Sequence, residues 1–194
     1  MKCMKKKRQS YRERYFSDFQ AVQVSANNRK GYRIVYQYTG LWKSWENAGK
    51  RKWLIGMLEI AGLILFGVCA AVDAPINRAR FASGFGVLSV AAWLAELSGV
   101  LRFLAAKEYI RELSWDETDR AIRYGCIIRG TLTELTGLLG IADSVGNGTA
   151  GCVDWLILAG LTISSLTAFA TWRLYGKLRI LTYHNQNGRP GDRV

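Results

Sequence analysis

The chain has 194 residues, which is enough for one domain of ordinary size. Its formal charge of +12 is uneven, because residues 1–52 hold 14 of the 27 lysines and arginines against three acids, and the rest is close to neutral. A block this basic binds nucleic acid or an anionic membrane surface. Because a long apolar stretch follows it directly, we expect the lipid bilayer and no nucleic acid as the partner.

The segment before the first apolar stretch is rich in aromatic residues. Within residues 8–26, the aromatic side chains are spaced as in a short amphipathic helix that lies at the lipid headgroups. A disordered basic tail is the alternative. Residues 32–38 alternate like a β-strand, with Ile34, Tyr36 and Tyr38 on one face. We therefore expect a basic, partly amphipathic cytoplasmic segment that lies on the membrane.

The end of this segment carries residue types that prefer a membrane surface. Indole rings favour the headgroup region, and clustered lysines and arginines are attracted to the anionic lipids of an inner leaflet. The tryptophans expected in this interfacial belt are Trp42, Trp45 and Trp53. The basic residues expected at the membrane surface are Lys5, Lys6, Lys7, Arg8, Lys50, Arg51 and Lys52.

Four apolar stretches follow, and each is close to the roughly 20 residues with which a helix crosses the hydrocarbon core. They cover about 53–72, 81–106, 124–145 and 152–175. The sequence therefore predicts an all-α membrane protein with a four-helix transmembrane bundle. The third stretch is the weakest because it contains several charges and glycines. A soluble bundle with unusually buried helices is the alternative. It is disfavoured because the apolar runs have no polar face.

The third stretch has a recognisable start. Ser114 and Glu117 form a capping box, which predicts a helix that begins near Trp115 and continues without a break into the apolar residues. At the other end of the chain, residues 176–194 are predicted to form a largely disordered cytoplasmic tail.

The distribution of lysine and arginine predicts the orientation. The N-terminal segment, the middle loop and the C-terminal tail are basic, whereas residues 144–151 contain neither lysine nor arginine. Basic loops stay on the cytoplasmic side. We therefore expect a multi-pass protein of the plasma or inner membrane with both termini in the cytoplasm.

A five-residue phrase recurs in the apolar stretches. It begins with glutamate at Glu59, Glu96 and Glu134, and a glycine follows three residues later in each case. The fourth copy has Ile157 in place of the acid. Residues three apart share a helix face, so each glycine is predicted to form a notch for helix packing beside the acid. These glycines are Gly62, Gly99, Gly137 and Gly160.

The three glutamates are expected at one depth. Each lies five to seven residues from a basic residue on its cytoplasmic side, namely Lys52, Arg102 and Arg129. At about 1.5 Å per residue these gaps are roughly 8–10 Å. The sequence thus predicts a layer of carboxylates in the inner half of the membrane, with Arg102 and Arg129 completing an intramembrane polar cluster.

Three uses of this cluster remain open. The glutamates can bind helices together, either protonated or paired with Arg102 or Arg129. They can receive a basic or polar residue from the transmembrane helix of another protein. They can also carry protons or bind cations during transport.

No catalytic chemistry emerges from the remaining residues. The single histidine, His184, lies in the tail, and no nucleotide-binding or metal-binding motif occurs. Cys69 and Cys152 are expected near the same membrane face, so a disulfide between them is geometrically possible, but two free thiols are the favoured interpretation. We therefore expect no cofactor, no metal and no enzyme activity. The expected function is that of an accessory or assembly subunit that contacts membrane proteins or itself, and a small proton- or cation-dependent carrier is the alternative.

Overall fold

A computed structural model describes residues 19–25, 31–46, 48–106 and 109–183 of the chain. The described residues are mostly helical. The long helices are α2 (Gly49–Ala71), α4 (Arg80–Ala105), α5 (Glu112–Gly146) and α6 (Cys152–Gly176), and a single turn, α3 (Pro75–Arg78), connects α2 to α4. The chain divides into a helical unit (residues 45–107 and 116–179) and a strand unit formed by the remaining residues.

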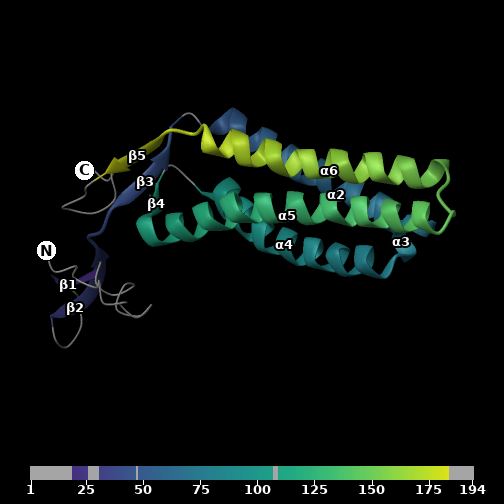
Figure 1. The fold of residues 1–194 in the computed structure, drawn as a ribbon. Coiled ribbons are helices and arrows are strands. Elements are labelled where there is room, and N and C mark those ends of the chain that lie inside the picture. The colour runs from purple at the N-terminus through teal and green to yellow at the C-terminus, as the bar shows by residue number, and fades with distance from the viewer. Residues whose placement is uncertain (1–18, 26–30, 47, 107–108, 184–194) are drawn as a thin grey trace, which may run out of the picture. The chain divides into compact units, whose positions relative to one another are not determined.

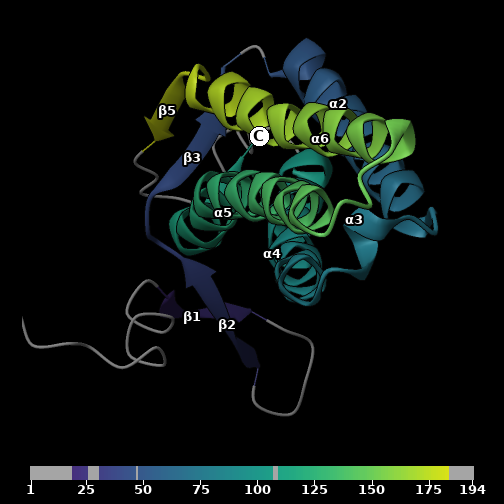
Figure 2. The same ribbon diagram turned by 45° about the vertical axis from the view of Figure 1, so that its right-hand side comes forward.

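In the helical unit, the long helices α2, α4, α5 and α6 lie side by side (Figure 1). Helices α2 and α6 pack closely on one side of this unit, and α4 and α5 lie on the other (Figure 2). Each long helix contains all or nearly all of one of the four predicted apolar stretches, and α5 continues without a break into the third, as predicted. The predicted start of α5 near Trp115 is wrong, because the helix begins at Glu112 and Ser114 lies inside it. Among the described residues, α2, α4 and α6 are long and apolar enough to cross a membrane, whereas α5 is not among them.

Three sets of contacts hold the helical unit together. At one end, Trp45, Phe103 and Tyr175 pack edge to face, with ring centroids 4.8 and 5.4 Å apart. Near α3, Ile76 packs with Ile157 and neighbouring apolar residues. Between these two apolar clusters lies a group of buried charges, described below.

Basic residues at the start of α2 bind the ends of two neighbouring helices. Arg51 donates from Nη1 to the carbonyl of Lys177 (2.6 Å), and Lys52 donates from Nζ to the carbonyl of Ala106 (2.5 Å). These carbonyls lie where α6 and α4 end, and the C-terminal end of a helix attracts cations. Two of the predicted membrane-surface residues thus stabilise the helix ends, while Lys50 is exposed. Lys5, Lys6, Lys7 and Arg8 lie outside the described residues.

The strand unit departs from the expected all-α fold. Strands β1 (Phe19–Ser25) and β2 (Tyr32–Tyr38) form an antiparallel hairpin, and β3 (Trp42–Trp45) lies between β4 (Ile110–Arg111) and β5 (Ile180–Tyr183). The predicted strand at 32–38 is confirmed. The amphipathic helix is wrong for residues 19–25, because the β-branched valines there pair with β2 in full register.

Two further expectations need correction. Residues 180–183 of the predicted disordered tail form β5, and residues 184–194 lie outside the described part of the chain. Only one of the three tryptophans faces outward, because Trp53 is 69% exposed whereas Trp42 and Trp45 are buried.

Cys69, Cys126 and Cys152 are all free thiols, so Cys69 and Cys152 do not form a disulfide.

Gly125→Ala is expected to destabilise the helical unit. The added methyl group would lie 2.7 Å from Cβ and 2.9 Å from Cα of Glu96, and such overpacking costs about 1–3 kcal/mol. Gly67→Ala is the matched control, because nothing lies within 4 Å of its added Cβ. Thermal unfolding in detergent measures both variants. Equal unfolding midpoints would contradict the close approach of α4 and α5.

Candidate functional site: a buried arginine between two glutamates

Arg129 on α5 joins three helices through two carboxylates. Its Nη2 donates to Glu59 Oε1 on α2 (3.0 Å), and its Nε and Nη2 donate to Glu96 Oε2 (2.6 Å) and Oε1 (3.1 Å) on α4. The bond to Glu96 is the two-point geometry that a guanidinium offers a carboxylate. Glu96 is 0%, Glu59 3% and Arg129 4% exposed, so the group is enclosed by protein.

Two further donors complete this group. Cys126 donates from Sγ to Glu96 Oε1 (2.9 Å), and Trp93 donates from Nε1 to Glu59 Oε2 (3.3 Å). Cys126 and Arg129 are three residues apart on α5 and therefore share its inner face. Gly125 allows this face to approach the backbone of Glu96. We call Glu59, Glu96, Arg129 and these two donors the Arg129 cluster.

The Arg129 cluster contains two carboxylates and one guanidinium. Burying charges is expensive, and mutual pairing offsets that cost only when the remaining hydrogen bonds are also made. With both carboxylates ionised, the formal charge of the cluster is −1. An additional anion is therefore disfavoured here, whereas a neutral group or a cation is tolerated.

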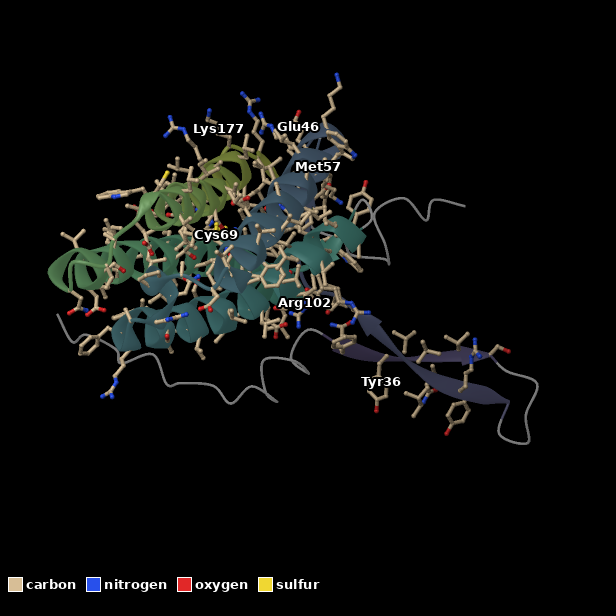
Figure 3. All side chains as sticks on the ribbon, turned by 90° about the vertical axis from the view of Figure 1, so that its right-hand side faces the viewer. Tyr36, Glu46, Met57, Cys69, Arg102 and Lys177 are labelled. Carbon is tan, nitrogen blue, oxygen red and sulfur yellow. The ribbon has the colours of Figure 1, made fainter. Side chains whose placement is uncertain are left out.

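The structure separates Glu134 and Arg102 from the Arg129 cluster. Glu134 lies five residues beyond Arg129, a rise of about 7.5 Å along α5, and its Oε1 accepts a hydrogen bond from Thr162 Oγ1 on α6 (3.3 Å). Arg102 lies in the last turn of α4 (Figure 3) and forms an exposed ion pair with Glu117 (2.7 Å). Of the five predicted residues, the structure brings together Glu59, Glu96 and Arg129.

All four glycines of the repeated phrase lie at contacts between helices. A Cβ added to Gly62 would lie 3.1 Å from Arg129 Nη1. A Cβ added to Gly99 would lie 2.7 Å from Ala121, and one added to Gly137 would lie 2.9 Å from Leu158. A Cβ added to Gly160 would collide with Cys69 Sγ, which lies within the helical unit (Figure 3).

A small pocket adjoins the Arg129 cluster, between α2 and α4. Its volume is about 80 Å³. Apolar side chains of α2 and α4 form its walls, and polar groups from α4, α5 and α6 also line it. The lining residues are Gly62, Leu63, Phe66, Ser89, Val90, Trp93, Arg129, Thr133 and Ser164.

Sequence reasoning missed the partners that shape this site. The spacing of Cys126 and Arg129 placed both on one face of α5, and that signal was available. Nothing in the sequence pointed to Trp93 or to the hydroxyl groups around the pocket. No protein-family model matches the chain, and neither a curated protein nor a solved structure is significantly similar to it.

Arg129→Met is expected to destabilise the helical unit by about 3–5 kcal/mol, because it leaves two buried carboxylates without their counter-charge. The control Arg102→Met removes an exposed ion pair and should cost less than about 1 kcal/mol. Adding Glu96→Gln to Arg129→Met should recover part of the loss. The free energy of unfolding in detergent is the measurement. Similar losses of stability for Arg129→Met and Arg102→Met would contradict the role of Arg129 as the counter-charge of two buried carboxylates.

Proposed function

We propose that this chain is an integral membrane protein in which all four long helices span the bilayer. This proposal is supported by the distribution of polar and apolar side chains, which is the reverse of that in a water-soluble protein. The charges of the Arg129 cluster are inside, whereas large apolar side chains face outward on α2, α4 and α6, including Ile64 (59% exposed), Val87 (71%) and Leu156 (66%). Apolar outer faces suit lipid, and intramembrane charges that face the bundle interior are typical of membrane proteins.

We also propose that both termini lie in the cytoplasm of a cell whose plasma or inner membrane holds the protein. The basic start of α2 and the end of α6 support this orientation. There, Arg51, Lys177 and Arg179 line a polar pocket of about 250 Å³ together with Glu46. Three cations beside one acid at the membrane surface suit the phosphate of an anionic lipid.

The proposed role is that of a non-enzymatic accessory or assembly subunit that works by helix–helix contacts with other membrane proteins. One observation carries this proposal. Glu59 and Glu96 are held by Arg129 in ion pairs that fix the helices in register, so the same acids are not available as mobile carriers. The exposed apolar faces of the helices then remain as the surfaces through which the protein acts.

Transport of protons or cations is the alternative function. The pocket beside Arg129 favours it, because the hydroxyls of Ser89, Thr133 and Ser164 gather there. Against it, Ser89 and Thr133 bond to each other (2.6 Å), and Ser164 donates to the carbonyl of Gly62 (3.0 Å). Hydroxyls engaged in this way hold helices together.

The four-span topology predicts that the two ends of α5 lie on opposite sides of the membrane. Arg120→Cys and Asn147→Cys, each in a chain whose native cysteines are alanine, place one thiol at an exposed position near each end. A membrane-impermeant maleimide added to intact cells should label position 147 and spare position 120 until the membrane is opened. Labelling of both positions, or of neither, in intact cells would refute a span by α5.

The accessory role predicts a partner at fixed stoichiometry. Tagged protein purified in mild detergent from the cells that produce it should retain another membrane protein through size exclusion. A bulky substitution on one outer face, such as Ile64→Trp on α2 or Leu156→Trp on α6, should release that partner without lowering the unfolding midpoint.

Two results would contradict the accessory role. One is a chain that purifies without any stoichiometric partner. The other is pH-driven or cation-driven flux in liposomes that contain only this protein, abolished by Glu134→Gln. The second result would establish the transport alternative.

A further inference from the structure

The guanidinium of Arg129 has one nitrogen left to bond. Nε and Nη2 are engaged with Glu96 and Glu59, while Nη1 has no hydrogen-bond acceptor among the residues that the structure describes. Each terminal nitrogen of a guanidinium carries two N–H donors. Arg129 is 4% exposed, but Nη1 is not one of the fully buried polar atoms that lack a partner, so this nitrogen reaches open space from which an acceptor can bind it.

Nη1 lies beside the pocket between α2 and α4. The Cβ that Gly62 lacks would be 3.1 Å from this nitrogen, and both Gly62 and Arg129 line the pocket. The other polar groups around it have partners, since Ser89 bonds to Thr133 and Ser164 to a carbonyl. The rim is half-exposed and apolar, with Leu63 on α2 and Val90 on α4.

Charge, size and depth restrict the occupant. The formal charge of −1 on the Arg129 cluster disfavours an anion and admits a neutral acceptor. A volume of about 80 Å³ holds a group of a few heavy atoms. The pocket is lined by residues 62–66 of α2 and 89–93 of α4, away from the ends of both helices. In the proposed four-span topology it therefore lies within the hydrocarbon core, where lipids carry no polar atoms of their own. A transmembrane helix that carries a short polar side chain meets all three conditions.

We propose that this pocket receives the side-chain amide of an asparagine or glutamine from a transmembrane helix of another protein, and that its carbonyl oxygen accepts from Arg129 Nη1. The partner helix then lies in the groove between α2 and α4. A second copy of this chain is not the source, because α2, α4, α5 and α6 contain no asparagine or glutamine. This inference rests on the proposed accessory role and gives its partner a chemical signature.

The test measures binding of two synthetic peptides to the full-length protein in phosphatidylcholine vesicles. Both peptides are leucine-rich transmembrane helices that differ only in a central asparagine or leucine. The protein carries an acceptor dye at the exposed Cys152 in a Cys3→Ser background, and energy transfer from a dye on the peptide reports association. The asparagine peptide should bind about threefold to thirtyfold more tightly, the range for one interhelical hydrogen bond.

Two variants locate the site without disturbing the ion pairs. Val90→Trp places an indole at the half-exposed rim of the pocket and should abolish the preference for asparagine. Val87→Trp is the matched control, since it lies on α4 one turn away, is 71% exposed and does not line the pocket. It should keep the preference.

Equal binding of the two peptides to the unmodified protein would overturn the inference, as would a preference that survives in Val90→Trp or disappears in Val87→Trp. The same variants separate this inference from the accessory role. If a native partner co-purifies with the Val90→Trp protein as well as with the unmodified chain, the accessory role stands and the pocket is not its docking site.

Discussion

The helical unit depends on one side chain, Arg129, whose guanidinium holds two carboxylates from two other helices. Buried ion pairs add little net stability compared with apolar packing, but removing one member leaves an unpaired buried charge. Their main effect is therefore on register, because α2, α4 and α5 have to align before the bonds form. Gly125 lets α5 approach the backbone of Glu96, and Cys126 adds a thiol donor to the same carboxylate, so both residues support the alignment of α4 and α5.

The same side chain makes the unit asymmetric. Helix α6 packs closely on α2, and its glycine Gly160 contacts Cys69, whereas α2 and α4 leave a pocket between them at the level of Arg129. A guanidinium has donors on three sides, and two of them are used by carboxylates. The third side faces the pocket. The pocket and the unfinished hydrogen bonding of Arg129 therefore coincide, which sets this position apart from the other apolar faces of the helices.

Much of the helical unit could be predicted from the sequence, because long apolar runs and a capping box are local signals. The composition of the charged site could not, for a geometric reason. The repeated phrase fixes a glycine beside each acid, but not the depth or the direction of that acid once the helices pack. Glu134 lies about 7.5 Å beyond Arg129 along α5, and Ile157 lies in the apolar cluster with Ile76. The strand at residues 19–25 was missed because it depends on pairing with residues 32–38, which no local pattern reports.

Helix α5 shows how a local signal can mislead about the role of a helix. Its charged side chains keep it from qualifying as a membrane span by composition, yet the most important of them, Arg129, is only 4% exposed. Hydropathy counts an arginine as a cost wherever it lies. In a packed group of helices that cost is offset by the acids on α2 and α4, which are themselves unfavourable in apolar surroundings without the arginine. The low hydropathy of α5 and the two acids in its neighbours are therefore parts of a single interaction, and the helices that carry them have to be considered together.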